Sequence, residues 1–411
     1  MASSPSPTHA RGLGPVLGTA LIVASVLGPG ILGLPALAYA RSGPAFLVAL
    51  GGILIMSVFI ALTFAFLGRR GNEGSDIAGY VRSAFGARGG AIVGYWFYFG
   101  VTPGMAALGL IAGEYVRGLI GGGLVTVVGT AAILLAVATL GSLAGVRLSA
   151  GLQLILTGTL LVLLWLAVTL ALPAADASHL HPFAPEGWGA ILPAALILVW
   201  FLTGWEAAAN LTGLLRDPRR RLLPITVAAL VILAATFAAV CLVMVLALGP
   251  AATEGAPIGA MLAITLGPAG PALGAVTAVI LTLGNMNAYL ASLVAVGGTL
   301  AREGLLPSAG RVMLTAIPVG LTVLALAAAP LLPQATELFV SLSAASQIPV
   351  LLIGSAAGLM LLPRRSAGRS LALGATVSSA LLLAVAGWYL LAPLLIAGIA
   401  LLAFRRRGAP A

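Results

Sequence analysis

The sequence predicts an all-α integral membrane protein that crosses the bilayer twelve times. Of its 411 residues, 61% are hydrophobic and only 7% are charged, which is more apolar surface than the core of a soluble protein can bury. Apolar runs of about 20 residues or more, each long enough to cross a hydrocarbon layer of about 30 Å, succeed one another along the chain. We therefore expect one transmembrane domain over residues 1–411, with no soluble domain between the spans.

Twelve apolar stretches define the expected helices, and a cytoplasmic tail over residues 1–13 precedes them. Their limits follow from the apolar runs and from the polar, Gly and Pro residues that separate them. The expected spans are 14–40, 44–68, 90–118, 122–143, 147–173, 189–215, 223–249, 271–300, 311–331, 335–362, 370–387 and 389–404.

The placement of the arginines tests this layout. With a cytoplasmic N-terminus, every arginine except Arg41 and Arg117 falls in a cytoplasmic tail or loop, and Arg11, Arg147 and Arg216 are among them. Cytoplasmic loops of membrane proteins are enriched in basic residues, so this asymmetry supports both the span count and cytoplasmic N- and C-termini. We expect a multi-pass protein of the inner (plasma) membrane.

Three connecting segments are long enough to have structure of their own. Residues 71–88 mix apolar and polar residues and fit either a short amphipathic helix on the cytoplasmic surface or a solvated loop. Residues 249–267 are long enough to form an external lid. The external loop 176–188 carries His179 and His181, which lack further metal-ligating partners in the sequence, so we expect no metal site there.

The charged residues and the cysteine exclude several classes of function. The net charge of +10 reflects loop arginines, so it does not indicate a nucleic-acid partner. The chain has no lysine, which excludes a Walker A loop and direct drive by ATP. Cys241 is the only cysteine, which rules out an internal disulfide, and we expect it to pack in an apolar helix. No cofactor is expected.

Two expected spans are interrupted near their centres. The first contains "SVLGPGILGLP", residues Ser25 to Pro35, with three glycines and two prolines. The sixth contains "LTGWEAAAN", which places Thr203, Gly204, Glu206 and Asn210 at membrane depth. An ionisable group at this depth must face protein or water.

The two interrupted spans run in opposite directions through the membrane, which is typical of an inverted repeat. Residues 14–173 would form the first repeat and residues 189–362 the second, with the two spans of 370–404 appended. Unwinding a helix in the membrane frees N–H groups on one side of the break and carbonyl groups on the other. The N–H groups attract a carboxylate and the carbonyls attract an ammonium group, so paired breaks suit the backbone of an amino acid. A plain Pro-Gly kink with glycine-mediated packing is the alternative.

The motifs resemble those of the amino acid–polyamine–organocation (APC) superfamily of permeases, whose members share the LeuT-type 5+5 inverted-repeat fold. "GPGILGLP" is similar to the family's first-helix signature, "FLTGWEAAANL" to that of the sixth helix, and "LLRDPRRRLLPIT" to the cytoplasmic segment that follows it. "LAREGLLP" resembles the turn between the eighth and ninth helices. The short chain and "NMNAYLASL" in the eighth helix most resemble the bacterial exporters of L-methionine and branched-chain amino acids.

The resemblance implies a substrate site at both breaks and on two further helices. The carboxylate loop would fall on Gly28, Pro29 and Gly30, and the ammonium-binding carbonyls on Val26, Trp200 and Thr203. The full set that it implies is Ser25, Val26, Gly28, Pro29, Gly30, Ile31, Tyr95, Tyr98, Met105, Trp200, Thr203, Gly204, Asn285, Asn287 and Tyr289. As alternatives, the aromatic residues of the third helix lie in the core or at the interface, and the asparagines of the eighth bond to neighbouring helices.

Pro29 departs from the family pattern, in which Ser, Thr or Ala is usual at this place. Proline has no N–H to donate. Carboxylate binding would then depend on the N–H groups of Gly28, Gly30 and Ile31, assisted by the hydroxyl of Ser25.

Glu206 is the leading candidate for proton coupling, because it is the only acid at membrane depth. A gate or a structural hydrogen bond is the alternative role, and Glu114 and Glu337 near external helix ends are weaker candidates for coupling. The fifth span has Thr157 and no basic residue where some relatives place a lysine, and a sodium site built from oxygen ligands stays open.

The sequence therefore predicts a secondary active transporter that exports neutral hydrophobic amino acids such as methionine, leucine, isoleucine and valine in exchange for protons. No arginine lies at membrane depth, which disfavours charged substrate side chains. Uptake or exchange of amino acids is the alternative within the family. A membrane-embedded enzyme would need acids or histidines clustered at one interface, and a channel subunit would show no saturable transport.

Overall fold

The computed structural model describes residues 14–70, 76–145, 150–206, 215, 217–307 and 310–407. The expected tail with Arg11, and also Arg147, Asn210 and Arg216, lie outside these residues. Within the described part of the chain, nine helical stretches are long and apolar enough to cross a membrane, and three shorter apolar helices accompany them.

The first half of the chain begins with a helix in two pieces. The short helix α1, Pro15–Val26, is followed by a 3-10 turn (η1, Pro29–Leu32) and by α2, Leu34–Ser42. The helices that follow are α3 (Phe46–Gly68), α4 (Ile77–Gly100), α5 (Thr102–Ile120), α6 (Gly123–Leu143) and α7 (Ala150–Ala171).

The second half also begins with a short helix, α8 (Ile191–Leu198), which tightens into a 3-10 turn (η6, Val199–Leu202). A further short turn, η8 (Gly249–Thr253), leads into α11. The remaining helices are α10 (Pro218–Leu248), α11 (Pro257–Leu266), α12 (Ala269–Arg302), α13 (Arg311–Ala328), α14 (Ala335–Leu361), α15 (Ala367–Ala386) and α16 (Leu391–Arg407).

The structure differs from the sequence expectation most clearly around the third span. Helix α4 begins at Ile77, where the Asp76 side chain accepts the Gly79 N–H at 2.7 Å, so the second part of the segment 71–88 is helical. The helix turns sharply at Gly86, whose φ of 80° suits glycine. Instead of one helix over 90–118, the chain passes from α4 to α5 at Val101, before Pro103, which has no N–H to continue the ladder.

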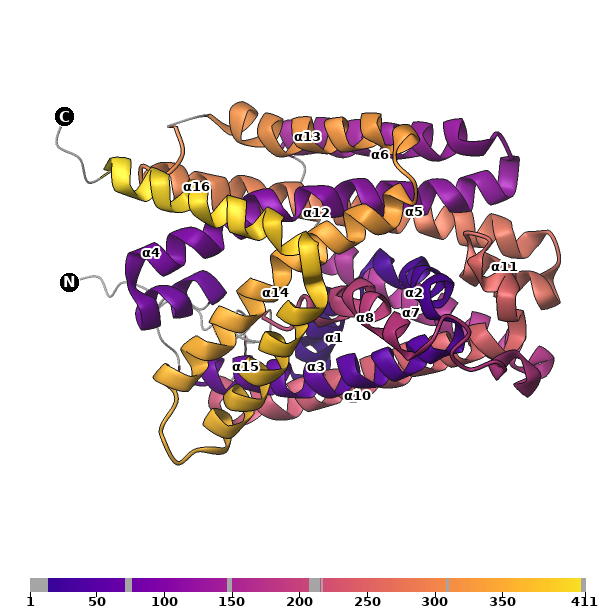
Figure 1. Ribbon diagram of the computed structural model, residues 1–411, viewed down its shortest axis with the longest axis horizontal. Coiled ribbons are helices and arrows are strands. Elements are labelled where there is room, and N and C mark those ends of the chain that lie inside the picture. The colour runs from indigo at the N-terminus through magenta and orange to yellow at the C-terminus, as the bar shows by residue number, and fades with distance from the viewer. Residues whose placement is uncertain are drawn as a thin grey trace, which may run out of the picture.

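The two broken segments lie in the middle of the molecule, with longer helices around them (Figure 1). Helix α2 packs against α8, η1 contacts α5 and α12, and η6 contacts α3. The breaks are thus held in position by α3, α5 and α12, and α10 packs against α1.

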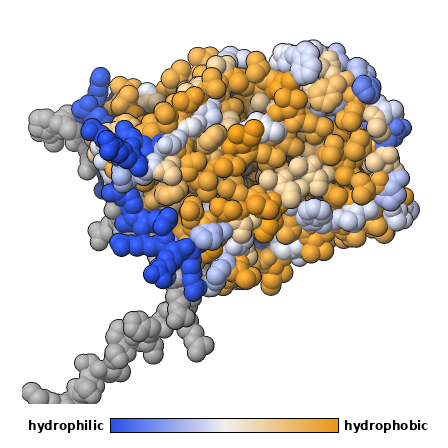
Figure 2. All heavy atoms as spheres, turned by 90° about the horizontal axis from the view of Figure 1, so that it is seen from below, coloured by the Kyte–Doolittle hydropathy of each residue, from blue (hydrophilic) through white to orange (hydrophobic). Residues whose placement is uncertain are grey.

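The surface separates into a broad apolar belt and a polar end (Figure 2). Exposed apolar side chains on the belt include Ile133 and Leu140 of α6 and Val323 and Leu324 of α13. Such a belt is stable in lipid and costly in water. Together with the apolar helices, it identifies an integral membrane protein that crosses the membrane several times.

Strongly hydrophilic residues gather at one end of the molecule, on the left in Figure 2. We call it the arginine-rich end because Arg70, Arg82 and Arg88 join helix ends there. Three contacts join the helix ends found there. Arg70 donates to the Leu361 carbonyl, Arg82 pairs with Glu303 at 2.6 Å, and the Arg88 guanidinium lies 5.7 Å from the centre of the Phe404 ring. The ends of α3, α12, α14 and α16 therefore lie on the same side as the start of α4.

Candidate functional site

The first break separates α1 from α2. After Val26 the chain becomes extended at Gly28 (φ −95°, ψ 175°), and Pro29 and Pro35 start the two helical pieces that follow. Both prolines lack the N–H that an uninterrupted helix would need. The Gly28 N–H bonds to the Val26 carbonyl at 3.0 Å and the Ile31 N–H to the Gly28 carbonyl at 3.4 Å. Of the three expected carboxylate donors, only the Gly30 N–H has no hydrogen bond in the described turn.

The second break follows η6. Thr203 is extended (ψ 146°), and both its N–H and its hydroxyl donate to the Trp200 carbonyl, at 3.3 and 2.8 Å. The next residue, Gly204, has a φ of +98°, which strongly favours glycine. A carbonyl expected to bind the substrate's ammonium group thus already accepts two hydrogen bonds from Thr203.

The two breaks meet at Gly204. A Cβ at this position would lie 2.3 Å from the Ser25 carbonyl oxygen and 3.0 Å from the Val26 Cα. Only a residue without a side chain fits here. The close approach brings the peptide groups freed by both breaks to one place.

A cavity of about 40 Å³ lies between the breaks. Most of the residues implied by the family resemblance line it: Ser25, Val26, Gly28, Pro29, Gly30, Ile31, Trp200, Thr203, Asn285 and Tyr289. The other lining residues, which the sequence analysis did not identify, are Leu34, Leu108, Phe201 and Phe237.

The four additional residues form an apolar wall. Phe201 and Phe237 stack with ring centres 4.1 Å apart and planes 11° from parallel. Leu34 and Phe201 lie within the motifs GPGILGLP and FLTGWEAAANL, which is a signal that could have identified them. Leu108 and Phe237 sit in ordinary apolar helices, where nothing in the sequence distinguishes them from core residues.

Five implied residues do not line this cavity: Gly204, which forms the contact between the breaks, and Tyr95, Tyr98, Met105 and Asn287. The Tyr95 hydroxyl donates to the Leu305 carbonyl, and the Tyr98 hydroxyl donates to the Leu314 carbonyl at 2.9 Å. Met105 is fully buried in the core. The Asn287 amide nitrogen would lie 3.2 Å from a Cβ at Gly141, so this side chain faces α6. These contacts correspond to the alternatives of core packing and helix-to-helix contact.

Glu206 lies next to the second break. One carboxylate oxygen accepts the Gly204 N–H at 2.9 Å, so the side chain stabilises the turn that brings the breaks together. This is a structural hydrogen bond, the alternative role that the sequence left open.

Two residues that line the cavity each carry a buried polar atom without a hydrogen-bond partner among the described residues: the indole nitrogen of Trp200 and the amide oxygen of Asn285. Buried polar groups normally have partners, so these atoms are suited to a ligand or to water. One is a donor and the other an acceptor. The described residues contain no group of His, Cys, Asp or Glu side chains able to hold a metal ion.

A second cavity of about 40 Å³ lies on the other face of the first break. Gln153 and Thr157 of α7 supply oxygen atoms to its wall, and Asn285 and Gly28 belong to both cavities. Asn285 therefore stands between the two spaces.

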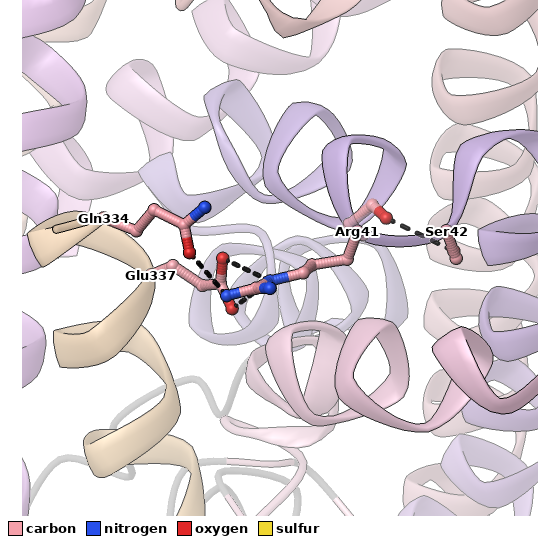
Figure 3. A network of polar contacts seen from close by, with 5 residues as sticks. Arg41, Ser42, Gln334 and Glu337 are labelled. Carbon is pink, nitrogen blue, oxygen red and sulfur yellow. Dashed lines mark hydrogen bonds and ion pairs between the residues drawn. The ribbon is translucent and has the colours of Figure 1, made fainter. Parts of the chain in front are cut away.

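The side of the breaks away from the arginine-rich end is tied together by a polar network (Figure 3). The Arg41 Nε, in the last turn of α2, lies 2.6 and 2.7 Å from the two carboxylate oxygens of Glu337 in the first turn of α14. The other part of its guanidinium donates to the Gln334 side chain at 2.5 Å. The network fixes α2, the second piece of the broken helix, to the second half of the chain.

Comparison with known proteins agrees with this architecture. The profile of the family described as "Amino acid permease" matches residues 13–409. The chain belongs to the amino acid permease family. This permease is 28% identical over 418 residues to the uncharacterized amino acid permease YecA of Bacillus subtilis (strain 168), an alignment that covers 98% of this chain and 97% of that protein.

Two further relatives match shorter parts of the permease. The L-methionine/branched-chain amino acid exporter YjeH of Escherichia coli (strain K12) is 31% identical over 216 residues, which is 51% of this chain and 50% of that protein. The cationic amino acid transporter 9, chloroplastic, of Arabidopsis thaliana is 31% identical over 123 residues, which is 30% of this chain and 22% of that protein. Membership of this family points to amino acid transport rather than to enzymatic catalysis.

Proposed function

We propose that this permease is a secondary transporter that exports neutral hydrophobic amino acids, with the substrate bound in the cavity between the two breaks. One observation carries the proposal: Gly30, Trp200 and Asn285 line one cavity whose remaining wall is largely apolar, and they carry a free backbone N–H, a free indole N–H and a free amide oxygen. The N–H groups suit a carboxylate, and the amide oxygen suits an ammonium group.

The wall favours an uncharged substrate side chain. Leu34, Leu108, Phe201 and Phe237 offer apolar surface, and none of the lining residues in the described part of the chain is an arginine or an acid. A charged side chain placed there would lose its hydration without gaining a partner. Methionine, leucine, isoleucine and valine suit this wall, and one relative is named as an exporter of methionine and branched-chain amino acids.

We further propose the twelve-span, inverted-repeat arrangement for the whole chain. The segment α1–η1–α2 forms one broken span, and α8–η6 begins the other. The arginine-rich end faces the cytoplasm because basic residues are retained on that side, so both termini are cytoplasmic. The ion pair of Arg41 and Glu337 then lies on the external side.

Transport requires the cavity to open. A space of about 40 Å³ holds a few water molecules at most and is too small for methionine. Ser25, on the α1 side of the cavity, is exposed, whereas the α2 side is tied to α14 by Arg41. We take this conformation as closed to the outside, with release of the Arg41 network as part of outward opening.

The experiment is a panel of labelled amino acids in liposomes that contain the purified permease. We expect saturable flux of methionine and the branched-chain amino acids, and a weak signal for arginine and glutamate. Flux driven by an imposed pH gradient supports proton antiport. Flux that needs only an amino acid on the opposite side supports exchange, and accumulation against a gradient in the inward direction supports uptake. Absence of saturable flux for every neutral amino acid would contradict the proposal.

A further inference from the structure

The hydroxyl of Tyr115 joins two segments that are far apart in the sequence. Tyr115 lies in α5 and is 1% exposed. Its hydroxyl donates to the Leu32 carbonyl at 2.7 Å and accepts the Ile258 N–H at 3.2 Å. One oxygen atom thus connects the first break with the start of α11.

The Leu32 carbonyl belongs to the break itself. Leu32 ends the turn η1, and the next helix begins at Leu34. Carbonyl groups at such a junction lose the regular i+4 donor of a helix, and a buried carbonyl without a donor is costly. Ile31 and Leu34, on either side of this junction, both line the cavity. The bond from Tyr115 therefore holds the backbone that carries two cavity residues.

The Ile258 N–H is also free of helical partners. Ile258 follows Pro257 in the first turn of α11, where N–H groups have no acceptor within the helix. The residue before the helix is Ala256, which has no side-chain acceptor, and no side-chain cap is present. The Tyr115 oxygen takes that role from a different helix.

The Tyr115 ring is also packed closely, against the two helices α11 and α12. A Cβ at Gly274 of α12 would lie 3.3 Å from the ring and 3.0 Å from the Gly259 Cα of α11. The two glycines let α11 and α12 approach each other beside the tyrosine. The ring therefore packs against α12, the helix that also carries Asn285 and Tyr289 of the cavity wall.

We propose that Tyr115 is a positioning residue that makes the docking of the α11 segment, defined as residues 249–266, and the closed geometry of the first break depend on each other. Movement of α2 away from the cavity breaks the bond to Leu32, and release of the α11 segment breaks the bond to Ile258. Each movement leaves a buried polar group without a partner, which favours movement of both together. The proposal rests on the cavity assignment of the proposed function.

Cysteine labelling tests this coupling without a transport assay. Ala252 in η8 and Ala38 in α2 are both fully buried, and the native Cys241 can be replaced by alanine. We introduce Ala252→Cys or Ala38→Cys singly and measure the rate of reaction with a soluble maleimide in lipid nanodiscs. With Tyr115→Phe, we expect about tenfold faster labelling at both positions, because two hydrogen bonds of modest net strength are lost.

Thr265→Val perturbs the α11 segment without touching Tyr115. The Thr265 hydroxyl ties the last turns of α11 to the Leu170 carbonyl at 3.0 Å. With Tyr115 intact, we expect Thr265→Val to accelerate labelling at 252 and also at 38, whereas in the Tyr115→Phe background it should accelerate labelling at 252 and leave labelling at 38 within about twofold. If Tyr115→Phe leaves position 38 unchanged, or if Thr265→Val affects position 38 equally with and without the Tyr115 hydroxyl, Tyr115 does not couple the two segments.

A second variant keeps the test valid if Tyr115→Phe is poorly folded. Gly274→Ala retains the hydroxyl but displaces the ring, so labelling at position 38 should rise in the same direction. An unchanged rate with a folded Gly274→Ala protein contradicts the proposal. If labelling changes as expected but the parent permease binds no amino acid, the coupling stands and the proposed substrate site is contradicted.

Discussion

Gly204 in the second break passes so close to the Ser25 carbonyl in the first that a Cβ on Gly204 would lie 2.3 Å from the oxygen. The two residues lie far apart in the sequence, one near the start of the chain and the other near its middle. Their contact brings the two interrupted segments together around one cavity.

Gly204→Ala should separate the breaks. The alanine meets both a clash with the Ser25 carbonyl and the unfavourable φ of +98°, which for a non-glycine residue costs on the order of 1 kcal/mol before the clash is counted. We expect at least about a hundredfold weaker methionine binding in scintillation-proximity measurements. Gly158→Ala in α7, where a Cβ meets nothing within 4 Å, is the control and should bind normally. Normal binding by Gly204→Ala would refute the role of this contact.

The ion pair between Arg41 and Glu337 should contribute a modest, measurable coupling energy. The side chains are 38% and 10% exposed, so solvent screens the pair in part. A double-mutant cycle with Arg41→Ala and Glu337→Ala, followed by thermal unfolding in detergent, should give about 1 kcal/mol. In each of these two single variants, the cysteine introduced by Ala38→Cys should react faster with the maleimide. Strictly additive single effects would show that the pair does not hold α2 closed.

Asn285 and Asn287 offer a matched comparison within one helix. The Asn285 oxygen lies on the cavity wall without a partner, whereas the Asn287 amide faces Gly141. Replacing a group that binds a charged ligand atom costs roughly tenfold or more in affinity. We expect Asn285→Ala to raise the Kd for methionine by that factor and Asn287→Ala to change it less. The reverse order in isothermal titration would place the site elsewhere.

Leu108 should influence which substrate side chain fits. It lines the cavity from α5, and a larger residue there reduces the space available. Leu108→Phe should weaken the binding of methionine and leucine by about tenfold more than the binding of alanine. The reason is that a smaller cavity excludes the larger ligands most strongly. Competition of labelled alanine against unlabelled methionine measures the ratio. Equal losses for all three amino acids would argue that Leu108 does not face the substrate side chain.

One substitution can separate the two candidate roles of Glu206, the structural hydrogen bond to Gly204 and the coupling of transport to protons. Its carboxylate accepts the Gly204 N–H, and the amide of Glu206→Gln can preserve that bond through its oxygen while removing the charge. Tyr289 of α12 is a titratable residue that lines the cavity, so Tyr289→Phe is measured beside it. If Glu206 carries the proton, the Gln variant should exchange amino acids but lose the response to a pH gradient. A full response would leave Glu206 with its structural role alone.

The sequence predicted the elements of this molecule better than their contacts. Pro29, Pro35 and Gly204 predicted both breaks because proline and glycine act locally on the backbone. The cavity residues around the first break were instead expected from the resemblance to the permease family. The resemblance did not predict that the Gly28 and Ile31 N–H groups would be used within the turn, leaving Gly30 as the free donor.

Contacts between distant helices could not be predicted in this way. Tyr95 and Tyr98 were expected to line the substrate site, but their hydroxyls donate to carbonyls of other segments. The direction of a side chain on an apolar helix depends on its neighbours, which the sequence does not show. Phe237 lines the cavity although its helix is apolar on every side. The bonds of Tyr115 to Leu32 and Ile258 likewise depend on packing between three segments.

Recognition of the amino acid backbone by the two breaks is the central claim, and competition binding tests it most directly. Labelled L-methionine bound to the purified permease is displaced by methionine analogues that lack either the carboxylate or the ammonium group. The account predicts that each analogue binds at least about a hundredfold more weakly than methionine, while leucine and valine compete within about tenfold. Analogues without a carboxylate or an ammonium group that compete as well as methionine would contradict it.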